Sequence, residues 1–226
     1  GATTGPLLWL VERLELFLYR RADRIISLTH SFQNDLLRRG IPCDKNDVVT
    51  NGVDAAFFAR EAATYDARTA LGVGRDTILA GYIGTVGMAH GLETILEAAA
   101  LARQRQDITF LILGEGAERA GLEAEARRRG LANLIFRDFV PHDLMPSYLA
   151  ALDLSIVHLR PDPLFKTVIP SKIFESMAMG VPVAKLERLY QELDVHQSAA
   201  AGLDVHRVPR ASAALALDAL PHARDL

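Results

Sequence analysis

The stretch TILAGYIG, residues 77–84, decides the fold class. It is a continuous apolar run that ends in glycine, which is typical of a parallel strand buried on both faces. Residues 91–105 follow with apolar side chains at helical spacing, and residues 108–116 give a second buried run that ends in glycines. Strand and helix keep alternating in this way up to residue 183. The pattern predicts an α/β fold with a Rossmann-like, doubly wound parallel sheet.

Length and composition indicate a globular protein without a general attraction to polyanions. The chain has 226 residues, half of them hydrophobic, and a formal net charge of −3. This balance argues against nucleic acid as a partner. Cys43 is the single cysteine, so the chain has no internal disulfide framework, and a reducing cytoplasm is the expected location. The sequence contains no metal-ligand pattern, and we expect neither a metal nor another cofactor.

Two segments outside the alternating pattern differ from it in composition. Residues 1–23 predict an amphipathic helix, in which Glu12 and Glu15 interrupt any potential membrane span. The apolar face of this helix requires a partner, either the domain that follows it or a membrane surface. Residues 184–226 lose the strand–helix alternation, so they predict an atypical tail that is either helical or the product of a frameshift.

Glycines follow two of the predicted strands at the edge where doubly wound sheets bind ligands. Gly84 precedes Thr85, and Gly114 ends the second strand. Such glycines allow backbone N–H groups to approach a phosphate. Thr85 adds a hydroxyl, and His90 adds a hydrogen-bond donor or a positive charge. Because the spacing is not the G-x-G-x-x-G fingerprint, a purely structural turn stays an alternative at both glycines.

A second polar group opens the helix predicted within LFKTVIPSKIFESMAMGVPV, residues 164–183. Ser171 is expected to cap this helix, and Lys172 can neutralise a phosphate. Glu175 can accept two hydrogen bonds from a vicinal diol such as a ribose. The alternative is an ion pair between Lys172 and Glu175, worth roughly a few tenths of a kcal/mol. The position of the helix after a predicted strand favours a ligand site.

Three segments together resemble the nucleotide-binding half of a GT-B glycosyltransferase of the family 4 type. They are ADRIISLTHSFQNDLLRRGIP with DVVTNGVDAAFF, GYIGTVGMAHGLETILEAAALA, and IPSKIFESMAMGVPV. The last two are similar to bacterial enzymes that add N-acetylated amino sugars in surface polysaccharide synthesis. The resemblance implies that residues 24–183 are the C-terminal, nucleotide-sugar-binding half of the GT-B architecture. It also implies that residues 1–23 are a linker helix from a missing N-terminal half.

The resemblance assigns donor-binding roles to residues of this chain. The glutamate that holds the donor ribose in the family matches Glu175. The segments near the diphosphate and the base match Gly84, Thr85, Ser171, Lys172, Phe139 and Val140. His90 and Gly114 are the remaining donor-binding candidates at the predicted ligand-binding edge of the sheet. No catalytic residue is identified.

The chain departs from the family pattern at the positions that carry charge. Thr167 stands where the family has a second glutamate, eight positions before Glu175. Thr85 and His90 stand in the region where a cationic pair is usual, so that Lys166 or Lys172 would supply the charge.

These features predict a domain that binds a nucleotide-sugar, with UDP as the expected leaving group. The resemblance implies sugar transfer to a hydroxyl of a lipid-linked or polysaccharide acceptor, which the missing half would bind. It allows peripheral membrane association of the full enzyme at the inner face of the membrane, and it implies little activity for this chain alone. Two alternatives stay open, a non-catalytic nucleotide-binding module and a UDP-sugar epimerase of GT-B shape.

Overall fold

A computed structural model of the chain describes residues 5–160 and 169–185. These residues form two compact units, one with residues 5–51 and residue 169, the other with residues 52–160 and 170–185. The division follows residue 51, and within the described residues the first two strands pair with each other and not with the larger sheet. The domain bounds that the resemblance implies, residues 24–183, stay a prediction. The predicted tail, residues 184–226, lies outside the described residues from residue 186 onward.

The first unit contains a short parallel sheet of two strands and two α-helices. Its elements are α1 (Pro6–Arg21), β1 (Ile25–Ser27), α2 (His30–Arg38), the 3-10 turn η1 (Cys43–Lys45) and β2 (Asn46–Val48). Thr29 caps α2, because its hydroxyl accepts from the N–H of Phe32 at 3.1 Å. No helix within the described ranges is long and apolar enough to cross a membrane.

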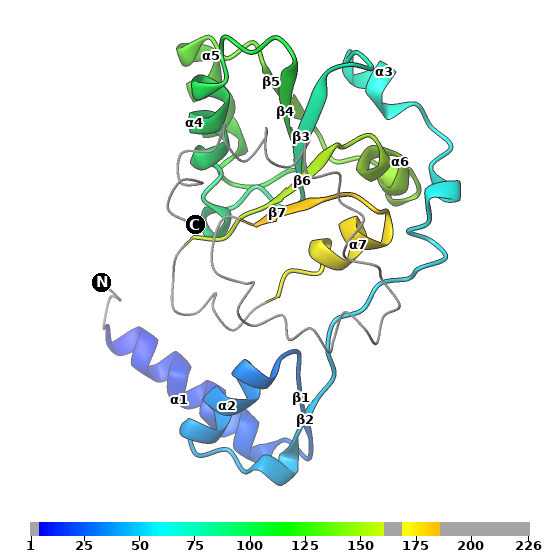
Figure 1. The fold of residues 1–226 in the computed structure, drawn as a ribbon. Coiled ribbons are helices and arrows are strands. Elements are labelled where there is room, and N and C mark those ends of the chain that lie inside the picture. Colours follow the sequence, from blue (N-terminus) through cyan, green and yellow to red (C-terminus); the bar gives the residue numbers. More distant parts are fainter. Residues whose placement is uncertain (1–4, 161–168, 186–226) are drawn as a thin grey trace. The chain divides into compact units, whose positions relative to one another are not determined.

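The second unit is built on a five-stranded parallel sheet with the strand order β5-β4-β3-β6-β7 (Figure 1). The strands are β3 (Ile78–Ile83), β4 (Ile108–Leu113), β5 (Leu134–Arg137), β6 (Leu154–Val157) and β7 (Val183–Lys185). The α-helices are α3 (Ala67–Leu71), α4 (Glu93–Leu101), α5 (Arg119–Arg129), α6 (Met145–Ala150) and α7 (Lys172–Ala178). Short 3-10 turns are η2 (Arg60–Ala62), η3 (Met88–His90) and η4 (His142–Leu144). The predicted α/β fold with a parallel sheet is confirmed.

Helices cover both faces of this sheet, as the apolar strands require. Figure 1 shows α4 and α5 on one side and α6 on the other. The side chains of β3 alternate between the two cores. Tyr82 packs with Ile95 of α4, and Leu79 packs with Leu149 of α6.

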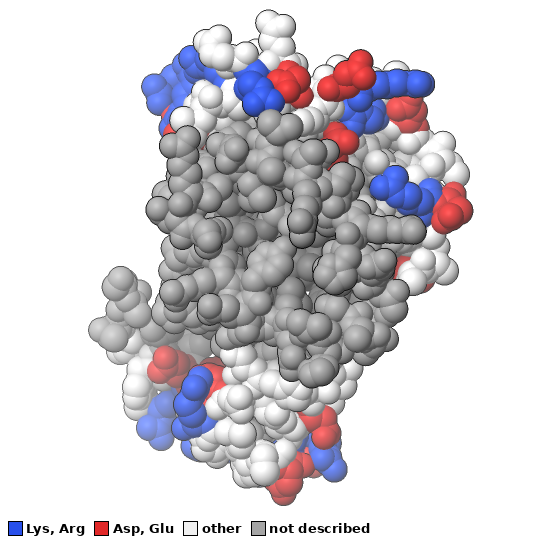
Figure 2. Space-filling view, viewed as in Figure 1, with Lys and Arg blue, Asp and Glu red and all other residues white. Residues whose placement is uncertain are grey.

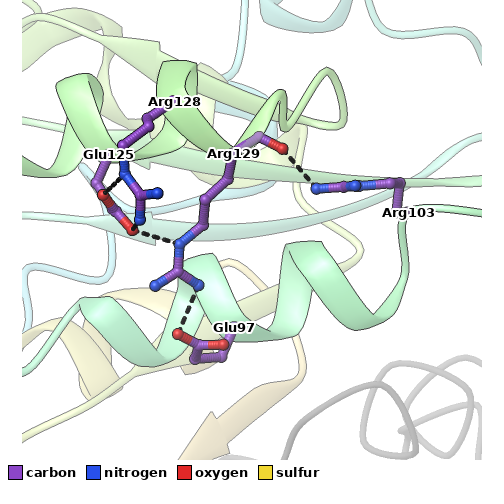
Figure 3. Close-up of polar contacts among 5 residues, drawn as sticks. All are labelled: Glu97, Arg103, Glu125, Arg128 and Arg129. Atoms are coloured by element: carbon purple, nitrogen blue, oxygen red, sulfur yellow. Dashed lines mark hydrogen bonds and ion pairs between the residues drawn. The ribbon is translucent and has the colours of Figure 1, made fainter.

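The surface of the second unit carries charges of both signs close together. In the view of Figure 2, blue and red side chains lie next to one another on the described surface. Figure 3 shows one such cluster, in which Arg129 of α5 joins Glu97 of α4 at 2.6 Å and Glu125 at 2.5 Å. Arg128 also binds Glu125, and Arg103 donates to the carbonyl of Arg129 at 2.5 Å. The Arg129–Glu97 pair connects α5 with α4, and the Arg103 hydrogen bond connects the end of α5 with the turn that follows α4.

The strand order places the switch point of the sheet between β3 and β6. The chain runs outward from β3 through β4 to β5, and it then returns to β6 on the opposite side of β3. In doubly wound sheets, ligands bind in the crevice beyond the carboxyl ends of the strands at this point. The loop after β3, the end of β6 and the start of α7 therefore frame the expected site.

Candidate functional site

The loops after β3 and β4 interlock through glycines. Gly84 has φ 148°, which favours glycine, and its N–H donates to the carbonyl of Leu113 at 2.9 Å. A β-carbon at Gly114 would collide with the carbonyl of Gly84, and one at Gly116 would collide with the carbonyl of Val86. The contact gives Gly114 a packing role, in line with the structural alternative. A role of Gly114 in ligand binding stays a prediction.

Lys172, in the first turn of α7, reaches back to the end of β3. Its Nζ donates to the hydroxyl of Tyr82 at 2.9 Å and lies 4.1 Å from the centroid of that ring. A β-carbon at Gly84 would collide with Nζ, so the ammonium lies against the bare α-carbon of this glycine. Burial lowers the pKa of Lys172 to about 8, and the nearby Glu175 carboxylate opposes that shift. The group is therefore a partly buried cation at neutral pH.

Glu175 does not serve as the direct partner of this cation. Lys172 and Glu175, both described residues, form no hydrogen bond or ion pair with each other, so the ion-pair alternative is wrong for these two side chains. Burial raises the pKa of Glu175, while Lys172 and His142 act on it through space in the opposite direction. Among the described residues, no donor forms a hydrogen bond with its carboxylate. A partly buried carboxylate of this kind is costly without a hydrogen-bonding partner.

Ser171 occupies the N-cap position of α7, but its side chain forms no capping hydrogen bond. The expected cap is therefore wrong. The reason is the backbone, because Ser171 has helical angles of φ −58° and ψ −32° rather than the extended angles of a capping residue. Its exposed hydroxyl is left at the same edge as Lys172. At the other end of α7, the N–H of Gly180 donates to the carbonyl of Met177 at 2.9 Å.

His90 and Thr85 lie in the segment between β3 and α4. The His90 ring is partly buried, with its centroid 5.7 Å from that of Tyr82. Burial, and secondly the charge of Lys172, lower the pKa of His90. His90 is therefore a neutral hydrogen-bonding group near pH 7 rather than the cation that the sequence also allowed. Thr85 is exposed, and its carbonyl accepts from the hydroxyl of Tyr82 at 2.7 Å.

Phe139 and Val140 follow β5 and differ in what they present. The side chain of Phe139 is 64% exposed, whereas Val140 is buried in the core beneath α6. Phe139 is thus available to a planar ligand, and Val140 can contribute only its backbone. The described contacts do not connect Phe139 with the group around Lys172. Lys166 and Thr167 lie outside the described residues.

Sequence reasoning missed two residues that organise this edge. Arg119, only 14% exposed, donates to the carbonyls of Gly114 and Arg137 and binds the Asp138 carboxylate at 2.9 Å. It therefore ties the ends of β4 and β5 together. Tyr82 connects Lys172 with the loop after β3. A tyrosine inside an otherwise aliphatic strand, two residues before its terminal glycine, was the signal available for it.

Two family models match the chain. The model described as glycosyl transferases group 1 matches residues 77–210, which is more than half of the chain. The model described as glycosyltransferase family 4 matches residues 1–57.

Two curated relatives are similar over most of this chain. The 2-deoxystreptamine glucosyltransferase of Streptomyces kanamyceticus is 31% identical over 185 residues, which cover 79% of this chain and 46% of that protein. WcaI of Escherichia coli strain K12, assigned to colanic acid biosynthesis as a glycosyl transferase, is 28% identical over 191 residues, 84% of this chain and 46% of that protein. The chain therefore spans about half the length of the curated relatives it matches.

The solved structure of Anabaena Alr3699/HepE in complex with UDP-glucose has a similar fold. The TM-score is 0.63 at 22% identity, over 76% of this chain and 47% of that one. The likeness shows the fold, that of the C-terminal Rossmann-like half of GT-B glycosyltransferases.

Proposed function

Because the chain belongs to the group 1 glycosyl transferases, we propose that it is the donor-binding half of an enzyme that transfers a sugar from a nucleotide to a hydroxyl group. The proposed donor is a UDP-sugar. Support comes from HepE, which shares this fold and whose structure was determined with UDP-glucose. The observation that carries the proposal is the position of Lys172, a partly buried cation held over Gly84 at the switch point of the sheet.

In this proposal Lys172 binds the diphosphate of the donor. Negative charge grows on the diphosphate as the bond to the sugar breaks, and a fixed cation stabilises that charge more than it stabilises the ground state. Gly84 contributes by having no side chain, because a β-carbon there would occupy the place of the ammonium. The exposed hydroxyls of Thr85 and Ser171 and the neutral ring of His90 are further hydrogen-bonding groups for the phosphates.

Glu175 binds the ribose in this proposal. Its carboxylate accepts no hydrogen bond among the described residues, and the vicinal hydroxyls of a ribose would satisfy it. Hydrogen bonds to a charged acceptor are worth about 1.5–3 kcal/mol each. The exposed ring of Phe139 offers a stacking surface for the uracil, and the backbone of Val140 offers it hydrogen bonds.

The acceptor is proposed to be a hydroxyl of a lipid-linked or polysaccharide molecule. The name of one relative refers to 2-deoxystreptamine and that of the other to colanic acid biosynthesis, although both relatives match this chain over a similar length. We therefore assign acceptor binding to a part of the enzyme other than this donor half.

Calorimetric titration of the 226-residue chain with UDP, ADP and GDP tests the proposed donor. The expected result is binding of UDP in preference to the other two, with weaker binding after Lys172→Met or Glu175→Gln. Glu97→Gln is the matched control, because Glu97 lies on α4 in the surface cluster of Figure 3 and should leave UDP affinity unchanged. Absence of UDP binding by the folded chain would reject the proposal.

A further inference from the structure

Tyr82 is an unusual residue for its position. It lies in the central strand β3, its side chain has no exposed surface, and it packs among the aliphatic residues beneath α4. A buried tyrosine hydroxyl requires hydrogen-bonding partners. The hydroxyl of Tyr82 has two, since it donates to the carbonyl of Thr85 at 2.7 Å and accepts from Nζ of Lys172 at 2.9 Å.

The direction of these hydrogen bonds follows from chemistry. An ammonium has only donors, so the tyrosine oxygen must accept from Lys172. The phenol proton is then directed at the carbonyl of Thr85, which can only accept. Burial raises the pKa of Tyr82, so the phenol keeps this proton throughout the neutral range. One hydroxyl therefore connects α7 with the loop after β3 in a single arrangement.

This arrangement counteracts the natural freedom of a lysine side chain. A lysine has a long, flexible stem and a strongly hydrated ammonium, which normally extends into water. Here the face of the Tyr82 ring lies 4.1 Å from Nζ and adds a cation–π contact. The ammonium is also confined by the α-carbon of Gly84 on another side. The remaining titratable groups that act on Lys172 or that its charge affects are Glu175 of α7 and His90 of η3.

We propose that Tyr82 is a positioning residue of the donor site, which holds the Lys172 ammonium over Gly84 and fixes the Thr85 loop to the same point. The inference rests on the proposed function, because it assigns the held ammonium to the donor diphosphate. A cation fixed before the ligand arrives avoids the entropic cost of ordering a free lysine upon binding. Tyr82 itself does not touch the donor.

A double-mutant cycle on UDP affinity separates this role from a merely structural one. The proteins are the wild-type chain, Tyr82→Phe, Lys172→Met and the double variant. Tyr82→Phe keeps the ring and removes only the hydroxyl, and we expect it to weaken UDP binding roughly five- to tenfold. In the Lys172→Met background the same substitution should change affinity by less than about twofold, because Tyr82 acts through Lys172.

The matched control is Tyr148→Phe. Tyr148 is another buried tyrosine, but it lies in α6 in the core on the other face of the sheet, so this substitution should leave UDP affinity unchanged. An equal loss from Tyr82→Phe with and without Lys172, or no loss in either background, overturns the inference.

A second readout tests Tyr82 without any ligand. The lysines of the chain are Lys45, Lys166, Lys172 and Lys185, so the side-chain signal of Lys172 in a ¹³C-lysine NMR spectrum can be assigned with Lys172→Met. In Tyr82→Phe the charged form loses an acceptor, and its titration midpoint should move to lower pH from the wild-type value of about 8. A midpoint that stays at the wild-type value overturns the inference, even if UDP does not bind. Failure of the wild-type chain to bind UDP, with a shifted midpoint, rejects the proposed function instead.

Discussion

The ammonium of Lys172 donates to the hydroxyl of Tyr82 at 2.9 Å, although the two residues lie ninety positions apart in the chain. This contact brings the start of α7 to the end of β3, at the point where the strand order of the sheet reverses. Lys172 and Glu175 form no ion pair with each other, so the cation and the carboxylate are separately available. The predictions on Lys172 and Glu175 below depend on that separation.

UDP binding should weaken as the pH rises through about 8. Burial lowers the pKa of Lys172 to about 8 in the free protein, and only the protonated form attracts the diphosphate. Above this pH a proton must be taken up for binding, so affinity should fall by up to about tenfold per pH unit. Calorimetric titrations at a series of pH values between 7 and 9.5 measure this. The Lys172→Met variant should show a flat profile, and a flat profile for the wild type would contradict the prediction.

The same group should make folding more stable at alkaline pH. The pKa of Lys172 is lower in the folded chain than the 10.5 of an unfolded lysine, so above the folded pKa the unfolded chain binds more protons. Stability therefore rises with pH between about 8 and 10.5 from this group. Melting curves of the wild type and of Lys172→Met measure this. As the pH rises over this range, the melting temperature of the wild type should increase relative to that of the variant. A difference that is independent of pH would count against a buried ammonium.

Glu175→Gln should weaken UDP binding by roughly tenfold or more, because the ribose loses a charged acceptor. The melting temperature should not fall, since no described residue forms a hydrogen bond with this carboxylate and its burial without a partner is costly. The control Glu97→Gln should behave in the opposite way, losing its ion pair with Arg129 but none of the UDP affinity. Unchanged affinity in a folded Glu175→Gln protein would remove Glu175 from the donor site.

Gly114→Ala should destabilise the fold by about 2 kcal/mol or more. Its φ of 137° is strained for any side chain, and the new β-carbon would collide with the backbone carbonyl of Gly84. The matched substitution is Gly121→Ala in α5, where the added carbon meets open space and the helix should gain about 0.5–1 kcal/mol. Chemical unfolding of both variants measures the two effects. A Gly114→Ala protein as stable as the wild type would show that the loops are not interlocked as described.

The sheet was predictable because each strand carries its own signal. TILAGYIG and the runs after it are apolar on both faces, and β3 to β7 all fall where the alternation predicted strands. The edge that holds the candidate site then followed from the general rule for parallel sheets. That β1 and β2 form a sheet of their own was not predictable, because they have the same local pattern as strands of the larger sheet and differ only in their pairing.

The place of the site at one edge of the sheet was predictable, but the contacts between its residues were not. Lys172 and Gly84 were both expected at the same edge, yet nothing in their spacing indicates that one lies against the other. Tyr82 was interpreted as part of an apolar strand, since a sequence does not show which groups a tyrosine hydroxyl will contact in the fold. The prediction that Ser171 caps the helix was wrong because capping depends on the backbone angles of the residue, and the residue type alone does not determine these angles.

Transfer of sugar by this chain alone should be slow or undetectable. Catalysis requires an acceptor held beside the donor, and the chain spans about half the length of its curated relatives. Incubation of the purified chain with UDP-sugars and a panel of hydroxyl acceptors, followed by product analysis, checks this. Rapid transfer would place acceptor binding within these 226 residues, and conversion of a UDP-sugar without any acceptor would indicate an epimerase.

The most direct test of the central claim is a crystal structure of the chain with UDP bound. The account predicts a diphosphate oxygen within about 3 Å of Nζ of Lys172, which is the distance of a charge-assisted hydrogen bond. In that structure the Lys172 ammonium should remain on the Tyr82 hydroxyl, and the ribose should lie on Glu175. A UDP molecule bound elsewhere, with Lys172 unchanged and free of phosphate, would contradict the account.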